Sequence, residues 1–214
     1  MAGVTSINLV EHALLVSIQD DITDTEILEL QDRLSNKISE NRIDGVILAT
    51  PNRLHEAGAL ACIDAGLPGL VEKPIADTLD NARLMAETAA AKGLPLVVGH
   101  HRRCHPFVMA TRAALPEIGQ LVGLQGLWSL RKHDTYYDVP WRRLPGAGPL
   151  ATNLSHEIDL LNVFAGLPVE VTALTSNTTR GHVIEDTAAL AFRFDSGALG
   201  SFLISDAGAS PWSF

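Results

Sequence analysis

Lys73 lies in a short segment whose residue types could serve proton transfer. The segment Glu72-Lys73-Pro74 directly follows the apolar run Gly69-Leu-Val71. Proline fixes φ and removes a backbone donor, so Pro74 is expected to bend the chain and project Lys73 from the end of a strand. A lysine in that place can hydrogen-bond a substrate hydroxyl and move its proton. The alternative is a surface Glu-Lys pair, which the three residues alone do not exclude.

His156 is the second candidate for acid–base chemistry. Asn153 and His156 are three positions apart in a predicted helix that also carries Asp159, so the first two are expected to share a face. An imidazole there could exchange a proton with a substrate hydroxyl while a hydride leaves the same carbon. The alternative is a core histidine of an amphipathic helix with no chemical role.

The segment His100-His-Arg-Arg-Cys-His105 raises the question of a metal site. Its spacing matches no common structural zinc pattern, and no second pair of ligands follows at a fitting distance. We therefore expect no metal site. The prediction is instead that His100, His101 and Arg102 position a cofactor or a substrate.

Residues Gly146-Ala-Gly148-Pro-Leu-Ala151 fit the pattern G-x-G-x-x-A of dinucleotide-binding turns. Such a turn follows a buried strand and precedes an acidic residue about 20 positions later. Here a Trp-Arg-Arg-Leu-Pro loop precedes it, and Pro149 stands where an amide donor is needed. We expect this segment to lead flexibly into the helix that carries His156, and the chain has no other G-x-G-x-x-G.

Strand and helix patterns alternate in the middle of the chain. Apolar runs at 45–50, 69–71 and 96–98 predict strands, and the patterns at 53–66 and 78–92 predict helices ended by glycines. This alternation is typical of βαβ units and a parallel sheet. The wholly apolar run at 45–50 indicates a strand buried on both faces. Ligands of such sheets bind beyond the carboxyl ends of the strands, here at Thr50-Pro51-Asn52, Glu72-Lys73-Pro74 and Gly99-His100-His101.

The two ends of the chain differ from this middle part. Residues 7–19 predict two short strands broken near Glu11 and His12, and residues 25–39 carry apolar side chains at helical spacing. After Pro106 the pattern predicts helices near 107–115 and 150–165, strands near 121–130, 169–176, 187–194 and 198–205, and a polar loop at 131–149. The predicted class is therefore α/β, a partial Rossmann-like parallel sheet followed by an α+β domain with a mostly antiparallel sheet.

Composition and charge exclude several classes of protein. The net charge of −9 argues against a nucleic-acid partner, because phosphate binding depends on clustered Lys and Arg. The sequence has neither a signal-peptide pattern nor an apolar run of membrane-spanning length, so we expect no membrane association and a cytoplasmic location. Cys62 and Cys104 are expected to be free thiols.

Four motifs occur in an order and spacing that resemble the Gfo/Idh/MocA oxidoreductases, a family that includes glucose–fructose oxidoreductase and inositol dehydrogenase. The resemblance covers about residues 44–214. The motifs are Ala49-Thr-Pro-Asn-Arg-Leu-His55, Glu72-Lys73-Pro74, Gly99-His-His-Arg-Arg103 and Gly146-Ala-Gly-Pro-Leu-Ala-Thr-Asn-Leu-Ser-His-Glu-Ile-Asp159.

The resemblance implies hydride transfer between NAD or NADP and a hydroxyl-bearing carbon of a sugar, polyol or related small molecule. It implies a Rossmann domain and a second domain whose open sheet often packs against another subunit, hence a homo-oligomer. By motif position, Lys73 would be the catalytic lysine and His156 the catalytic histidine, with Asn153 beside it. Thr152 stands where the family often has an aspartate. The nicotinamide and ribose side would be lined by Thr50, Pro51, Asn52, His55 and Glu72.

The chain departs from the family pattern at both ends. The glycine-rich first unit of the Rossmann domain is missing, so impaired cofactor binding is expected, and the substrate domain normally continues further. Residues 13–42 resemble instead the start of a stressosome-type STAS domain. The predicted domains are 1–43, STAS-like strands and helix that complete the sheet; 44–110, the second half of a Rossmann-like domain; and 111–214, a truncated substrate domain. An engineered chimera, a natural recombinant and a gene fragment all remain open.

Three functions compete at this point. The first is an NAD(P)-dependent oxidoreductase, and the second is a non-enzymatic, partner-binding hybrid protein in which replacing Lys73 changes nothing. The third is a metal-dependent hydrolase built on His100, His101 and His105. The sequence does not decide the substrate or the choice between NAD and NADP.

Overall fold

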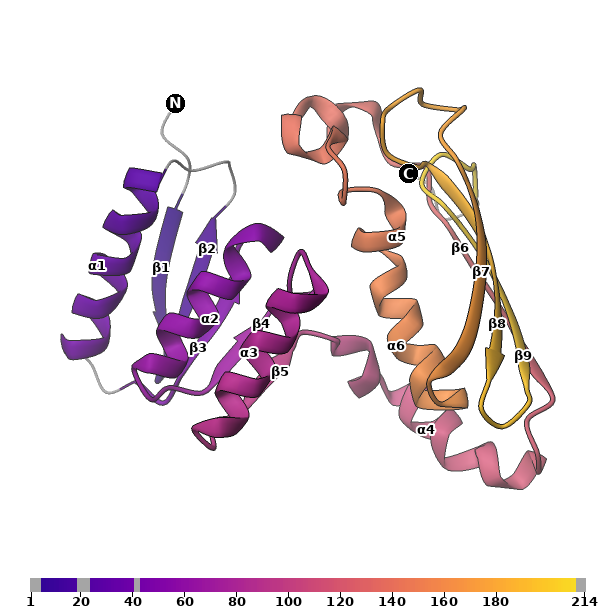
Figure 1. Cartoon of the computed structure of the whole chain (residues 1–214), viewed down its shortest axis with the longest axis horizontal. Helices are drawn as coiled ribbons and strands as arrows, with labels where there is room; N and C mark the ends of the chain where they lie inside the picture. The colour runs from indigo at the N-terminus through magenta and orange to yellow at the C-terminus, as the bar shows by residue number, and fades with distance from the viewer. Residues whose placement is uncertain (1–4, 19–23, 41–42, 211–214) are drawn as a thin grey trace. The chain divides into compact units, whose positions relative to one another are not determined.

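The computed structural model describes residues 5–18, 24–40 and 43–210 (Figure 1). The chain divides into two units, Met1–Gly99 and His100–Phe214. None of the described helices is long and apolar enough to cross a membrane.

The first unit is built on a five-stranded sheet. Its strands are β1 (Thr5–Val10), β2 (Ala13–Ile18), β3 (Gly45–Ala49), β4 (Gly69–Val71) and β5 (Leu96–Val98), in the order β1-β2-β3-β4-β5. β1 pairs antiparallel with β2, and the other pairs are parallel. The turn between β1 and β2 includes Glu11 at a positive φ of 54°. The break predicted near Glu11 and the predicted parallel sheet are thus confirmed.

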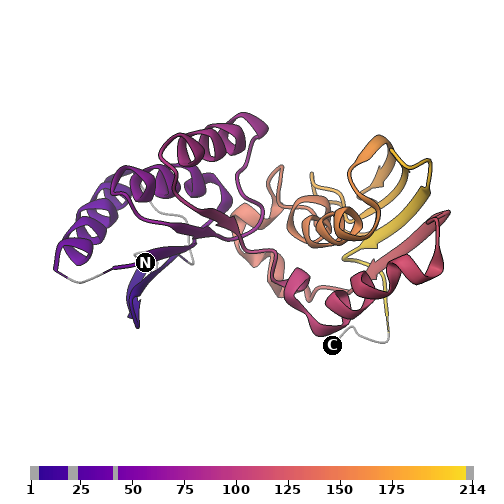
Figure 2. The same ribbon diagram turned by 90° about the horizontal axis from the view of Figure 1, so that it is seen from below.

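Three helices connect the parallel strands: α1 (Asp24–Glu40), α2 (His55–Asp64) and α3 (Leu79–Ala91). A strand order that never reverses places every right-handed crossover on the same face of a sheet. The three helices accordingly lie along one face of the sheet (Figure 2). Leu34 of α1, Cys62 of α2 and Met85 of α3 belong to one core with Leu14 and Val46.

One expectation for β3 is wrong. Its side chains alternate between buried Val46 and Leu48 and half-buried Ile47, so β3 is fully buried on one face only. The physical reason is that the helices described in this unit all cover the same face. A wholly apolar run does not reveal how many faces are covered.

The second unit pairs a four-stranded sheet with helices. Its strands β6 (Gly123–Ser129), β7 (Pro168–Ser176), β8 (Thr187–Phe194) and β9 (Leu199–Ser205) have the order β6-β9-β8-β7. The β6–β9 pair is parallel and the other two pairs are antiparallel. Helix α6 (Leu154–Ala165) packs Leu154 and Leu161 against Phe192, Phe202 and Ile204.

The remaining elements of this unit are short. They are η2 (His101–Cys104), α4 (Pro106–Ala114), η3 (Leu115–Ile118), η4 (Asp134–Asp138), η5 (Pro140–Arg143) and α5 (Pro149–Thr152). Residues 100–110, which the sequence assigned to the first domain, pack with the second unit because Arg102 and Arg103 pair with acidic residues of α6. The α/β class with one largely parallel and one mostly antiparallel sheet is confirmed.

Candidate active site

The carboxyl ends of β3, β4 and β5 place three of the sequence motifs at one edge of the first sheet. Thr50 follows β3, Glu72 and Lys73 follow β4, and Gly99 follows β5. The Glu72 N–H donates to the carbonyl of Leu48 at 2.9 Å, and the Gly99 N–H donates to that of Val71 at 2.8 Å. Parallel pairing therefore brings together the segments that the sequence assigned to a ligand.

Glu72 packs its carboxylate against Gly99. A Cβ at Gly99 would lie only 3.2 Å from the Glu72 Cδ, so a glycine there leaves room for the carboxylate. The Lys73 N–H donates to Glu72 Oε2 at 3.2 Å. Glu72 is thus oriented by its own strand end, and the half-buried Lys73 follows it.

His55 is completely buried and joins two of these segments. Its Nδ1 lies 2.9 Å from the carbonyl oxygen of Pro74, and its Nε2 lies 2.8 Å from that of Thr50. Because both ring nitrogens are engaged with backbone, His55 holds the ends of β3 and β4 in register.

The other residues predicted on the cofactor side differ in their surroundings. Pro51 and Asn52 lie at the start of η1 (Asn52–Leu54), directly before α2. The buried Thr50 hydroxyl has no hydrogen-bond partner among the described residues. A buried, unsatisfied hydroxyl is costly, so it marks a place where a polar group of a ligand would be favourable.

The described residues offer no comparable binding site for the pyrophosphate of a dinucleotide. In a doubly wound sheet the dinucleotide crosses the point where the strand order reverses, and a glycine turn follows the first strand. The described strands show no reversal, and β2 stands next to β3 where that first strand would be. Residues 19–23 follow β2, contain two aspartates and no glycine, and lie outside the described residues. The nicotinamide side therefore fits a dinucleotide and the pyrophosphate side does not.

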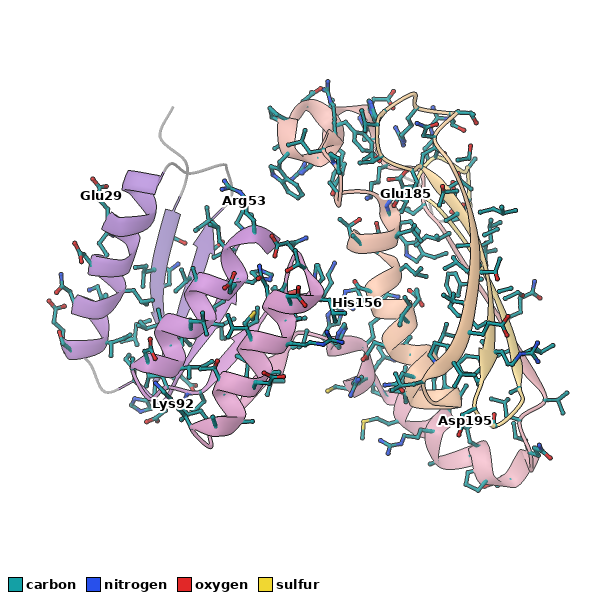
Figure 3. The ribbon with its side chains drawn as sticks, in the orientation of Figure 1. Glu29, Arg53, Lys92, His156, Glu185 and Asp195 are labelled. Carbon is teal, nitrogen blue, oxygen red and sulfur yellow. The ribbon has the colours of Figure 1, made fainter. Side chains whose placement is uncertain are left out.

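His156 lies within α6 of the second unit, where its side chain is 7% exposed (Figure 3). The His101 ring lies edge-on to it with centroids 4.8 Å apart, and the His100 ring lies 6.0 Å away. The structure thus brings together three imidazoles that the sequence named separately. A pocket of about 500 Å³ is lined in part by His101 and Arg102.

Two ion pairs attach η2 to α6. Arg102 pairs with Glu157, and Arg103 Nε donates to both carboxylate oxygens of Asp159 at 2.7 and 2.6 Å. The hydrogen bond to Asp159 raises the pKa of Arg103 above its ordinary value. Arg102, predicted to contact cofactor, is therefore engaged by α6, and these pairs hold His101 against His156.

Asn153 is the N-cap residue of α6, without a side-chain capping hydrogen bond, and its Oδ1 accepts a hydrogen bond from the Thr152 hydroxyl at 2.9 Å. Its carbonyl accepts from the His156 N–H at 3.3 Å. Asn153 is thus linked to His156 through backbone, at the junction of α5 and α6.

The G-x-G-x-x-A segment leads toward the helix that carries His156, but as a packed entry: Ala147, Gly148 and Pro149 are buried, and Pro149 begins α5. Its preceding element is the short turn η5, and Gly148 is the N-cap residue of α5. The Leu150 N–H donates to Glu185 Oε1 at 3.0 Å, so a distant carboxylate satisfies the helix start.

Cysteine and metal chemistry are limited in the described residues. Cys62 is buried and Cys104 exposed, both as free thiols, and burial raises the pKa of Cys62 to about 12. Within residues 5–18, 24–40 and 43–210 no three His, Cys, Asp or Glu side chains are grouped as metal ligands.

Both units match known domains. Residues 12–100 match the oxidoreductase family with an NAD-binding Rossmann fold, and residues 112–212 match the GFO/IDH/MocA C-terminal domain. The first match includes most of residues 13–42, so the suggested STAS-like segment and chimera are not supported.

Individual relatives agree with these matches. The chain is 30% identical to a 1,5-anhydro-D-fructose reductase of Ensifer adhaerens over 77% of its own length and 51% of the relative's. It is 29% identical to an inositol 2-dehydrogenase of Saccharopolyspora erythraea, over 76% and 48% respectively. The chain thus spans about half the length of these curated relatives.

Solved structures show the same likeness. The WlbA dehydrogenase from Bordetella pertussis, crystallised with NADH and UDP-GlcNAcA, is 26% identical, with a TM-score of 0.75 over 87% of this chain and 58% of that one. The corresponding enzyme from Chromobacterium violaceum has a TM-score of 0.73 at 26% identity. With both domains matched in order, the chain belongs to the Gfo/Idh/MocA family of oxidoreductases.

Proposed function

We propose that the chain carries the chemistry of an NAD(P)-dependent oxidoreductase acting on a hydroxyl-bearing carbon of a sugar or polyol. The observation that carries the proposal is the ordered match of both units to the two domains of one oxidoreductase family. The names of the relatives place their substrates among sugars and polyols.

Lys73 and His156 are the proposed proton-transfer residues. Lys73 follows β4 at the carboxyl edge of the first sheet, where ligands of open α/β sheets bind. His156 is buried on α6, and Asn153 is the N-cap residue of that helix. We assign the lysine ammonium to donate a hydrogen bond to a substrate hydroxyl, and the neutral imidazole to accept a proton from one.

Thr50, Pro51, Asn52 and Glu72 are the proposed neighbours of the nicotinamide and ribose, and NAD(P) supplies the hydride acceptor or donor when bound. His55 supports this side by fixing the Thr50 and Pro74 carbonyls. His100 and Arg102 are proposed to act from the second unit.

Cofactor binding by a polypeptide of this sequence is proposed to be weak. The segment after β2 has no glycine, and two aspartates stand there instead. Charge-assisted hydrogen bonds contribute about 1.5–3 kcal/mol each, so the loss of two weakens binding about a hundredfold or more. Carboxylates close to a pyrophosphate would add repulsion.

The alternative function is a non-enzymatic binding protein. It is favoured by the one observation that the described sheet lacks a reversal of strand order, the usual place of a dinucleotide. In that case Lys73 has no chemical role.

A titration with NADH and NADPH, monitored by tryptophan quenching, tests the proposal. A screen of sugars and polyols with the cofactor that binds comes next. We expect weak but saturable binding, and turnover that Lys73→Met and His156→Asn abolish without changing cofactor affinity. Arg83→Gln, on the exposed side of α3, is the control for a charge change. No binding at millimolar cofactor would favour the non-enzymatic alternative. Turnover that both substitutions leave unchanged would refute the roles proposed for Lys73 and His156.

A further inference from the structure

The second unit contains a pocket of about 370 Å³. Its lining comes from three connections: Arg131, Tyr137 and Arg143 follow β6, Arg180 and His182 follow β7, and Ala207 follows β9. β6 is parallel to β9, and β7 runs in the same direction because both β7 and β9 are antiparallel to β8. The carboxyl ends of these three strands therefore meet at one edge of the sheet.

The pocket has a fixed floor made by Tyr137. This side chain is 2% exposed, and its hydroxyl donates to Asp206. The Arg180 guanidinium lies 4.6 Å over the ring, and the His182 ring lies 5.0 Å from it. Burial and the hydrogen bond to Asp206 raise the pKa of Tyr137 well above its ordinary value, so the phenol stays neutral.

Arg180 forms one wall of the pocket and is held by several hydrogen bonds. Arg180 donates to the carbonyl oxygens of Lys132 and Asp206, each at 2.7 Å, and to Asp134 Oδ1 at 3.1 Å. Asp206, 1% exposed, also lies 3.4 Å from Lys132 Nζ. Positive groups thus already balance the buried Asp206 beneath the pocket.

The charge that faces the pocket is positive. Three arginines and one aspartate line it, and that aspartate, Asp134, is the exposed partner of Arg180. Arg143 donates from its Nε to the Tyr137 carbonyl and lies 3.7 Å from the exposed carboxylate of Asp138, while half of its side chain remains exposed. Guanidinium groups recognise carboxylates and phosphates through paired N–H donors.

We propose that this pocket binds a carboxylate or phosphate oxyanion, with Arg143 and Arg131 as its ligands and Tyr137 and His182 as its floor. That the bound molecule is also hydroxylated rests on the proposed function. The volume lies within the range of about 300–1,000 Å³ typical of small-molecule sites. All of these residues belong to the second unit, so the binding requires no nicotinamide cofactor.

Calorimetric titration of the full chain without cofactor tests the proposal, using glucuronate, glucose 6-phosphate, inorganic phosphate and glucose as probes. We expect at least one of the anionic sugars to bind about tenfold or more tightly than glucose, with an affinity that falls as salt rises. Preference for glucuronate identifies a carboxylate site, and preference for glucose 6-phosphate with binding of phosphate identifies a phosphate site.

Arg143→Gln is expected to weaken that binding about tenfold or more, because one charge-assisted pair is lost. Arg143→Lys should restore part of it, and Arg83→Gln in the first unit should leave it unchanged. Unchanged circular dichroism and thermal stability show that each variant is folded. Equal affinities for glucose and both anionic sugars, or full binding by a folded Arg143→Gln, would overturn the proposal, and neither result depends on NAD(P) binding.

Discussion

The carboxylate of Glu185 occupies the space in which a side chain at Gly148 would begin. A Cβ at Gly148 would overlap both Glu185 carboxylate oxygens, one of which accepts from the Leu150 N–H at 3.0 Å. The glycine is therefore needed for a helix start that is capped by a residue 35 positions beyond Leu150. This start sets the path of the chain into the helix that carries His156.

Gly148→Ala is expected to destabilise the second unit by about 1–3 kcal/mol, since the carboxylate must move. All three tryptophans, Trp128, Trp141 and Trp212, belong to this unit, so urea unfolding followed by their fluorescence measures the change. Glu185→Ala should cost about 1 kcal/mol through loss of the cap. The double variant should then lose less stability than the sum of the two single losses, because the introduced methyl group no longer meets a carboxylate. Strictly additive losses would contradict the overlap.

His55→Ala should lower the stability of the first unit by about 3 kcal/mol, because a buried side chain and its contacts with two backbone carbonyls are removed. His55 is fully buried between the carbonyls of Thr50 and Pro74. Native-state hydrogen exchange at β3 and β4 amides is the measurement. His12→Ala, in the exposed turn between β1 and β2, is the matched control, and equal exchange in the two variants would refute the positioning role.

The pKa of Cys62 gives a prediction for alkaline pH. Burial raises it from 9.0 to about 12, so the folded state keeps a proton that the unfolded state loses above pH 9. The stabilisation by this group is complete below pH 9 and is lost as pH rises from about 9 to about 12. Unfolding by urea across this range should show a steeper loss of stability for the wild type than for Cys62→Ala. Parallel curves for the two proteins would argue against it.

The face of the second sheet that α6 does not cover carries a row of exposed apolar side chains, and we expect the chain to self-associate through it. Leu127, Leu203, Ala189 and Leu174 are register partners across the four strands, and all are exposed. A contiguous apolar row of this kind is typical of a protein interface. We propose a homo-oligomer through this face, so light scattering should give more than one chain per particle and Leu203→Glu should reduce the mass. Leu84→Glu, a similarly exposed leucine on α3, should not. A monomeric wild type would exclude the interface.

The sequence by itself determined the elements and their order. Glycines at 66 and 93, both at positive φ, and the apolar runs between them fixed where strands and helices begin and end. These signals are local, because turn chemistry and hydrophobic period depend on neighbouring residues. The placement of Glu72 and Lys73 at a strand's carboxyl end follows from the same pattern.

Only the tertiary structure decided which side chains meet. The Arg103–Asp159 pair joins residues 56 positions apart, and the Tyr137–Asp206 bond joins residues 69 apart. The number of covered faces of β3 depends on where three helices pack, which its own apolar residues do not encode. Contacts across such separations depend on packing and register, and for this reason the sequence did not show which residues line the Tyr137 pocket.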